Sequence, residues 1–213
     1  MDKLLTEVCD IQYGFPFDSG MFNDSEGIPL IRIRDVKRGY SETFTTEKYT
    51  EEYVVNEGDI LIGMDGEFNI AKWGKIPAVL NQRVCRVFPH GDVDADYIFY
   101  SLPSELKKIE ARTSFATVKH LSAREINKIQ IPVPLLEEQR VIAKKIAIVT
   151  DVITKRKKQL EQFDLLIQSR FVELFGDPET NHKGWNECAL SERLNVLGGY
   201  AFKSDMFDEN GGI

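Results

Sequence analysis

The feature that most constrains this 213-residue sequence is a run of 41 residues, 135–175, that contains neither glycine nor proline. A proline stands just ahead of the run, acidic residues occupy its first turn, and Gly-Asp-Pro follows it directly. These are typical start and stop signals of a helix. A helix of this length spans about 60 Å, which is more than a small domain needs. The run therefore predicts one long helix that finds a partner helix.

Apolar residues recur along this run in alternating steps of three and four, which is typical of a coiled-coil seam. Arg156 and Arg170 occupy the two positions that would complete the series. The residues expected to pair with another helix are Ile142, Ile146, Val149, Ile153, Leu160, Phe163, Ile167 and Leu174. Packing of the helix against its own domain, with a kink near Arg156, is the alternative.

The first 134 residues predict a mixed, strand-rich α/β domain, because short apolar or alternating segments are separated by turn residues. Helical spacing appears once before the long helix, with Pro103 as a potential break. The expected strands are Ile28–Val36, Ile60–Ile62, Ala78–Phe88 (interrupted by Asn81–Arg83) and an edge strand within Ile126–Pro134, and the expected helix is Asp94–Glu110.

Composition excludes several classes of protein. No stretch of 18 apolar residues could form a membrane span, and the charged N-terminus lacks a secretory signal. The three cysteines, Cys9, Cys85 and Cys188, are far apart, which indicates a reduced, cytoplasmic chain without disulfides or a zinc knuckle. Three isolated histidines argue against a metal site.

The net charge of −7 is unevenly distributed. Residues 1–68 carry a balance of −9, residues 69–128 a balance of +4, and residues 129–213 a balance of −2. The middle segment is a basic island in an acidic chain, and a local basic patch is what phosphate groups require. Windows of this size also fluctuate by several charges without any function.

An internal repeat adds a second constraint. Residues 190–213 align without gaps on residues 5–28, with nine identities in 24 positions, among them Gly14/Gly199, Phe17/Phe202 and Phe22/Phe207. The recurrence of the aromatic residues, with Phe15 matched by Tyr200, favours core packing over base stacking. We expect residues 1–134 to form one domain, 135–176 the helix, 177–186 a linker and 187–213 the start of a second, truncated copy.

Five segments, together with the repeat and the helix between its copies, resemble the DNA-specificity (S) subunits of type I restriction-modification systems. The fifth is the most specific, because a strand ending in Pro-x-Pro is followed by Leu-Glu-Glu-Gln-Arg and the long helix. The segments are Gly14–Phe22, Ile31–Gly39, Gly58–Gly66, Leu80–Val87 and Ile129–Ile146.

The resemblance implies a non-catalytic subunit that binds double-stranded DNA, reads one half of a bipartite site and assembles with modification and restriction subunits. S-adenosylmethionine, ATP and Mg are then expected in those partners and no cofactor in this chain. The sequence has no phosphate loop, no cofactor loop and no adenine-flipping box. With one domain, we expect a homodimer through the long helix. The alternative is an interaction scaffold, oligomerised by its helix, that has lost DNA recognition.

Three stretches offer side chains that can reach base edges or phosphates. Solvated loops or structural hydrogen bonds are the alternative for each. The candidate DNA-binding residues are Asn69, Lys72 and Lys75; Asn81, Gln82 and Arg83; and Arg112, Thr113, Ser114, Lys119 and His120. A second basic group, Arg32, Arg34, Lys37 and Arg38, lies among acidic residues and predicts a neutralised surface. Asp59 and Asp65, which flank a glycine turn, are expected to be solvated rather than catalytic.

Overall fold

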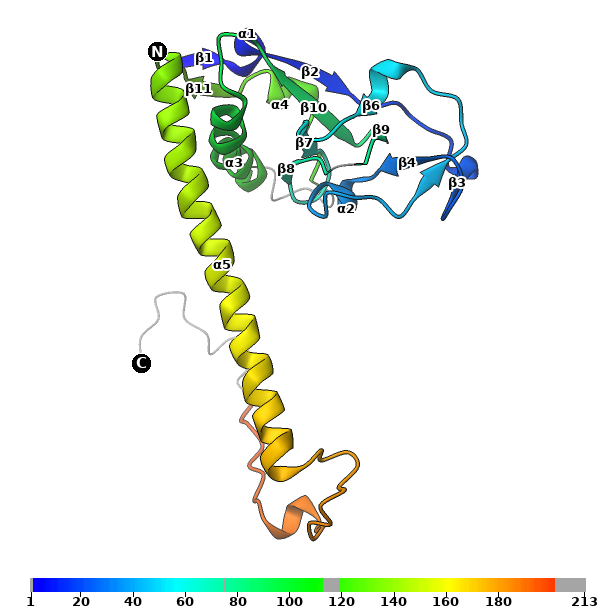
Figure 1. Ribbon diagram of the computed structural model, residues 1–213, viewed down its shortest axis with the longest axis vertical. Helices are drawn as coiled ribbons and strands as arrows, with labels where there is room; N and C mark the ends of the chain where they lie inside the picture. Colours follow the sequence, from blue (N-terminus) through cyan, green and yellow to red (C-terminus); the bar gives the residue numbers. More distant parts are fainter. Residues whose placement is uncertain (1, 75, 113–118, 202–213) are drawn as a thin grey trace. The chain divides into compact units, whose positions relative to one another are not determined.

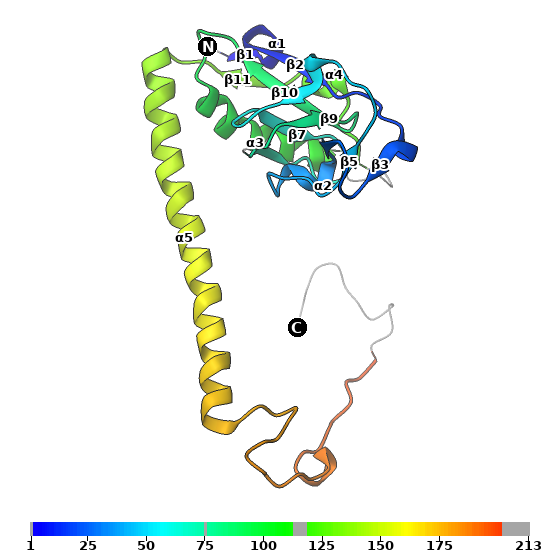
Figure 2. The ribbon, with the colours of Figure 1, turned by 45° about the vertical axis from the view of Figure 1, so that its right-hand side comes forward.

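The computed structural model describes residues 2–74, 76–112 and 119–201 (Figures 1 and 2). The chain divides into two compact units, residues 1–154 and 155–213. This division falls within the long helix, whereas the sequence analysis places the end of the first domain at residue 134. The domain boundaries given above remain predictions. We refer to residues 1–134 as the recognition domain.

The recognition domain consists of short strands and a few helices. Its strands are β1 (Asp2–Leu4), β2 (Cys9–Tyr13), β3 (Phe22–Asn23), β4 (Ile28–Ile31), β5 (Phe44–Thr45), β6 (Val54–Val55), β7 (Ile60–Gly63), β8 (Ile70–Lys72), β9 (Ala78–Leu80), β10 (Val84–Pro89) and β11 (Gln130–Pro132). Its helices are α1 (Leu5–Val8), η1 (Ser19–Met21), α2 (Ile33–Val36), η2 (Glu51–Tyr53), α3 (Ala95–Arg112) and α4 (Ala123–Ile126). The mixed α/β class predicted from the sequence is confirmed.

Three sheets organise these strands. The first has the order β2-β10-β7-β8 and is antiparallel throughout. The second has the order β3-β5-β4-β9-β6, in which β4 and β9 pair in parallel. In the third, β1 pairs with β11, so the start of the chain lies beside the segment that leads into the long helix (Figure 1).

The largest apolar core lies between the first sheet and α3. The predicted apolar face of α3, formed by Tyr97, Ile98, Leu102, Leu106 and Ile109, is buried, which confirms this helix. Pro103, the potential break, does not interrupt the helix, because α3 runs through this residue. The predicted core role of the repeated aromatic residues fits the first copy, since Phe17 is buried and Phe15 and Phe22 pack around it. In the second copy Tyr200 is 76% exposed, and Phe202 and Phe207 lie outside the described residues.

Two strand predictions were wrong in their extent. The expected strand Ile28–Val36 ends at Ile31 and turns into α2, because the Asp35 carboxylate accepts a hydrogen bond from the Arg32 backbone N–H at 2.9 Å and so closes a helical turn. The expected strand Ala78–Phe88 is two strands, β9 and β10, in different sheets, with a turn at Asn81–Arg83.

The expected edge strand within Ile126–Pro134 covers only β11. Ile126 ends α4, whose first turn is capped by the hydroxyl of Ser122. Pro132 ends the strand, as a residue without an N–H donor does at a sheet edge.

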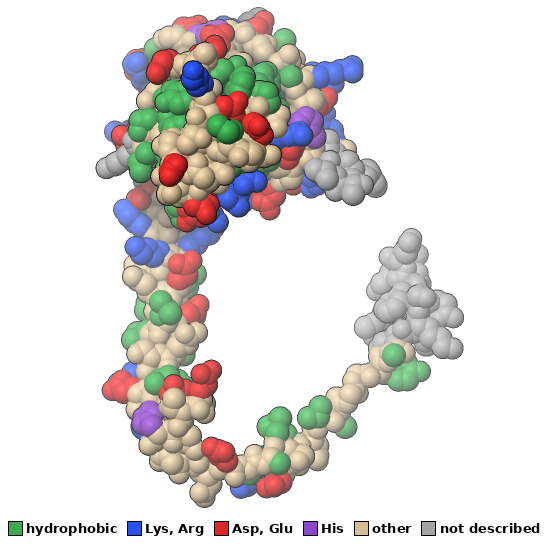
Figure 3. All heavy atoms as spheres, turned by 90° about the vertical axis from the view of Figure 1, so that its right-hand side faces the viewer, with side chains coloured by type: hydrophobic (Ala, Val, Ile, Leu, Met, Phe, Trp, Pro, Cys, Tyr) green, Lys and Arg blue, Asp and Glu red, His purple; other side chains and the backbone are tan. Residues whose placement is uncertain are grey.

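The long helix is confirmed as α5 (Leu136–Phe175), with no break at Arg156. Buried Gln139 anchors its start: the side-chain amide donates to the Pro134 carbonyl at 2.9 Å and accepts from the Asp94 N–H at 2.9 Å. The predicted seam residues are 38% to 67% exposed, so in one chain the seam lacks a cover among the described residues. Figure 3 shows apolar side chains at the surface along this helix, interspersed with charged ones.

The end of α5 is capped within the second unit. Gly176 adopts a left-handed conformation (φ 84°), and the Lys183 ammonium donates to the carbonyls of Glu173 and Leu174 at 2.9 and 2.7 Å. Of the expected second repeat copy, residues 202–213 lie outside the described residues. The described part contains η3 (Leu190–Glu192), and Leu190 is 66% exposed, whereas its counterpart Leu5 is buried.

No helix in the described ranges is both long enough and apolar enough to cross a membrane.

Candidate nucleic-acid interface

Four separate segments of the recognition domain surround one hollow of about 600 Å³. They are the first repeat copy, the β4–α2 junction, the loop before β8 and the turn between β9 and β10. The residues that line this hollow, here called the basic hollow, are Phe17, Ser19, Phe22, Arg32, Ile33, Arg34, Lys37, Asn69, Asn81, Gln82 and Arg83. Four of its side chains are cationic, and none of the described residues that line it is acidic.

The turn at Asn81–Arg83 is fixed by hydrogen bonds to segments far away in the sequence. The Gln82 N–H donates to the Phe15 carbonyl at 2.9 Å, and the Arg83 carbonyl accepts from the Met64 N–H at 2.9 Å. The Asn81 side-chain oxygen accepts from the Gln82 N–H at 2.8 Å. These hydrogen bonds fix the backbone of the turn. The side chains of Gln82 and Arg83 are exposed.

Gly14 permits this arrangement, because a Cβ at position 14 would lie 2.1 Å from the Asn81 carbonyl oxygen. Replacing Gly14 by alanine is therefore expected to displace the Asn81–Arg83 turn and to destabilise the recognition domain by about 1–3 kcal/mol. Urea unfolding measures this change. Gly91→Ala is the matched control, since nothing lies within 4 Å of its added Cβ. Equal stability of the two variants would contradict the requirement for close approach.

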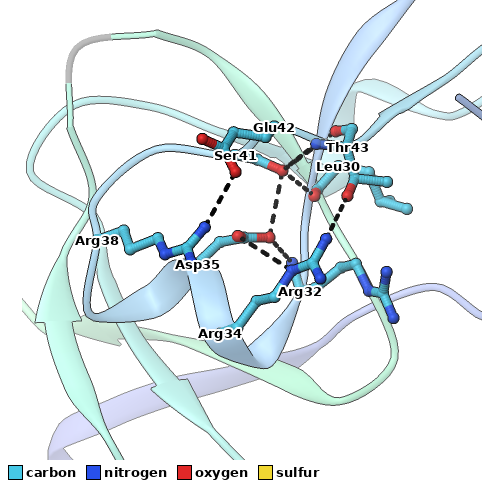
Figure 4. A network of polar contacts seen from close by, with 8 residues as sticks. All are labelled: Leu30, Arg32, Arg34, Asp35, Arg38, Ser41, Glu42 and Thr43. Atoms are coloured by element: carbon cyan, nitrogen blue, oxygen red, sulfur yellow. Dashed lines mark hydrogen bonds and ion pairs between the residues drawn. The ribbon is translucent and has the colours of Figure 1, made fainter. Parts of the chain in front are cut away.

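The other wall of the basic hollow is built around buried Asp35 (Figure 4). One carboxylate oxygen accepts from the Arg32 N–H at 2.9 Å and from the Ser41 hydroxyl at 3.2 Å. The Arg34 guanidinium lies 3.8 Å from the other oxygen and donates to the Thr43 hydroxyl at 3.1 Å. In Figure 4 the Arg32 guanidinium points away from this network. Asp35 thus fixes the backbone of Arg32 and lies near the guanidinium of Arg34. It can offset the charge of Arg34 but not that of Arg32.

The remaining cations of the hollow have acidic partners. Lys37 pairs with Glu67 at 2.5 Å, and this hydrogen bond lowers the pKa of the Glu67 carboxyl. Arg83 lies 3.4 Å from Asp65. On the face visible in Figure 3, Lys and Arg side chains are likewise mixed with Asp and Glu side chains. The hollow therefore gathers four cationic side chains, of which Arg34, Lys37 and Arg83 have an acidic neighbour.

Comparison with known proteins identifies the family. The type I restriction modification DNA specificity domain matches residues 1–162. The chain belongs to this family.

Individual relatives of this chain are also specificity subunits. The chain is 39% identical over 166 residues to the type I restriction enzyme EcoBI specificity subunit of Escherichia coli, covering 77% of this chain and 35% of that protein. It is 27% identical over 212 residues to the MjaVIII specificity subunit of Methanocaldococcus jannaschii, covering 86% of this chain and 49% of that protein. The chain therefore spans about a third to a half of the curated relatives it matches.

Solved structures show the same fold. The HsdS subunit from Thermoanaerobacter tengcongensis superposes with a TM-score of 0.59 at 20% identity, over 75% of this chain and 39% of that one. The type I restriction-modification S subunit from M. genitalium covers 100% of this chain and 57% of that one, with a TM-score of 0.57 at 17% identity.

The specificity domain brings some predicted site residues together and separates others. Asn69, Asn81, Gln82 and Arg83 all line the basic hollow. Lys72 does not: it pairs with Asp96 on α3 and lies 5.5 Å from the centroid of the Phe99 ring. Lys75 lies outside the described residues.

The third predicted stretch lies next to the loop before β8. Lys119 pairs with Glu110 at 2.9 Å, and His120 Nδ1 lies 2.5 Å from an Asp65 carboxylate oxygen. Arg112, at the end of α3, donates to the Lys108 carbonyl at 3.3 Å. Thr113 and Ser114 lie outside the described residues. Asp65 thus links this stretch to Arg83.

Both carboxylates considered as a catalytic pair are engaged structurally. Asp65 contacts Arg83 and His120, and Asp59 lies 2.8 Å from the guanidinium of buried Arg86. The expectation that they are solvated acids was therefore wrong, because each joins loops through an ion pair.

Sequence reasoning overlooked the contribution of Arg32, Arg34 and Lys37 to the same hollow as the Asn81–Arg83 turn. The expected neutralisation holds for Arg34 and Lys37, which have the acidic partners Asp35 and Glu67. Arg32 has no salt-bridge partner among the described residues. The parallel pairing of β4 with β9 places the two walls side by side, and this pairing leaves no local mark in the sequence.

Proposed function

We propose that this chain is the DNA-binding specificity subunit, or one half of it, of a type I restriction-modification system, reading one half of a bipartite duplex site. Membership of the DNA specificity domain family supports this assignment. The observation that links this assignment to a particular surface is the basic hollow, where four cations and three amides from three segments of the chain lie together. Cations supply phosphate contacts, and amides and guanidinium groups can recognise base edges.

Catalysis is assigned to partners under this proposal. A modification subunit would methylate with S-adenosylmethionine, and a restriction subunit would translocate and cleave with ATP and Mg. These roles rest on the family resemblance. This chain would place the complex on its sequence and contribute no reacting group.

Helix α5 has a role in the same proposal. Two half-sites read by two domains lie about 34 Å or slightly more apart along the duplex, and a paired helix about 60 Å long can hold the domains at a fixed separation. A second chain is the simplest partner, because an antiparallel pair lets the same seam pack against itself. Such a dimer would read an interrupted palindrome.

Duplex binding is expected to weaken steeply with salt. Three or four phosphates neutralised at the basic hollow give a slope of log affinity against log salt of about −3 to −4, or roughly a 100-fold loss between 50 and 200 mM. Fluorescence anisotropy with a labelled duplex measures this slope, with the chain alone and with a modification subunit added. A salt-independent signal in both cases would contradict the proposal and favour the scaffold alternative.

A further inference from the structure

The polar side chains of the basic hollow fall into two groups. Arg34, Lys37 and Arg83 have the acidic partners Asp35, Glu67 and Asp65. In contrast, four side chains of the hollow have no hydrogen-bond or ion-pair partner within the described parts of the chain: those of Ser19, Arg32, Asn69 and Gln82. Among them Asn69 is half-buried and Ser19 carries a single hydroxyl, whereas Arg32 and Gln82 are exposed and can each form two parallel hydrogen bonds. The two groups present different chemistry to the same ligand.

Recognition of a base edge requires free donors and acceptors in a fixed geometry. A guanidinium recognises guanine through two parallel donors to O6 and N7, and a side-chain amide recognises adenine with one donor and one acceptor. A side chain already engaged by a carboxylate offers fewer free donors for this purpose. The paired cations remain 53% to 61% exposed, so their outer sides can contact phosphates, which carry position but no sequence information.

The backbones of Arg32 and Gln82 are fixed. Buried Asp35 accepts from the Arg32 N–H at 2.9 Å, and the Phe15 carbonyl accepts from the Gln82 N–H at 2.9 Å. Base readers on anchored segments lose less conformational entropy on binding than readers on loose loops. Arg32 lies on the wall at the β4–α2 junction and Gln82 on the wall formed by the Asn81–Arg83 turn, and the parallel pairing of β4 with β9 places these two walls side by side.

We infer that Arg32 and Gln82 determine base specificity, Arg32 by recognising a guanine and Gln82 an adenine, while Arg34, Lys37 and Arg83 contact phosphates. This inference rests on the proposed function. It goes further by separating the residues of one hollow into those that select the sequence and those that fix the protein on the duplex.

Selection from a pool of duplexes with randomised positions, followed by sequencing of the bound fraction, tests the inference on the full chain with a modification subunit present. Arg32→Ala is expected to reduce the preference for guanine at one position by about 5- to 150-fold. The salt slope should stay unchanged, because a lost phosphate contact would reduce it by about 1. Arg32→Lys keeps the charge without the planar fork and should lose the same preference.

Gln82→Ala is expected to remove an adenine preference. Gln82→Glu keeps only acceptors and should shift that position toward cytosine, whose N4 group is a donor. The matched control is Arg38→Ala, which removes an equal charge from an exposed arginine that pairs with Glu42 and does not line the hollow. It should leave every base preference intact.

The outcomes distinguish a failure of this inference from a failure of the proposed function. If the Arg32 and Gln82 variants select the same sequence as the unaltered chain but bind every duplex more weakly, the inference is wrong and the proposed function stands. If the unaltered chain enriches no sequence and shows no salt-dependent binding, both fail. Thermal melting of each variant checks that its fold is intact.

Discussion

Replacing Arg86 by methionine is expected to lower the free energy of unfolding of the recognition domain by about 3–5 kcal/mol. The side chain is only 7% exposed, and its guanidinium donates to the Gln12 side chain, to the backbone carbonyls of Glu52 and Val54, and to the Asp59 carboxylate at 2.8 Å. These contacts tie the first sheet to β6 of the second. Methionine would leave the Gln12 side-chain oxygen without its donor, and the Asp59 carboxylate would lose its cationic partner and keep the hydrogen bond from the Asn56 N–H.

Urea unfolding followed by the fluorescence of buried Trp73, in a Trp185→Phe background, measures this loss. Arg83→Met is the matched control: that arginine is 53% exposed and has a single ion pair, so its loss should change stability by about 1 kcal/mol or less. Arg86→Lys should recover little, since one ammonium cannot reach acceptors placed for a planar fork. A loss below about 1 kcal/mol for Arg86→Met would show that the network does not hold the sheets together.

The elements predicted correctly were those whose signal is long and local. Helix α5 was placed within one residue at its start, because 40 residues with continuous apolar spacing and clear boundary signals leave no competing structure. The strands are mostly two to six residues long, too short for alternation to establish itself. The alternation in Ile31–Val36 was misleading, because a buried carboxylate at Asp35 closes a turn that the pattern does not encode.

The candidate site shows the same division between local and non-local information. Residues with suitable chemistry, such as Asn69 and the Asn81–Arg83 turn, could be selected from the sequence. Their convergence with Arg32 could not, because it depends on pairing between β4 and β9, which are nearly 50 residues apart. Two of the three acidic partners are also distant in sequence from their cations, since Lys37 and Glu67 are 30 residues apart and Asp65 precedes Arg83 by 18, whereas Asp35 directly follows Arg34.

Placing glutamate at Ile153 is expected to raise the dissociation constant of the helix-mediated dimer by about 100- to 10,000-fold. Ile153 lies at the middle of the predicted seam and is 49% exposed in the single chain. Burying each isoleucine side chain contributes about 1.5–3 kcal/mol, and a twofold dimer contains two such sites. Glutamate would also carry a charge into the interface, so the estimate from lost apolar burial is a lower one. Sedimentation velocity over a range of concentrations measures the dissociation constant.

The neighbouring Thr154→Glu variant controls for the added charge. It introduces the same negative group one residue along the helix, outside the series of seam positions, and should leave the dimer intact. Circular dichroism of both variants reports whether α5 itself persists, since helices in water depend on packing of their apolar face. If the unaltered chain remains monomeric at high micromolar concentration, the seam does not pair with itself, and the apolar stripe is then left for a helix of a different chain. If both variants dissociate equally, charge rather than apolar packing controls association, and the spacer role proposed for α5 loses its physical basis.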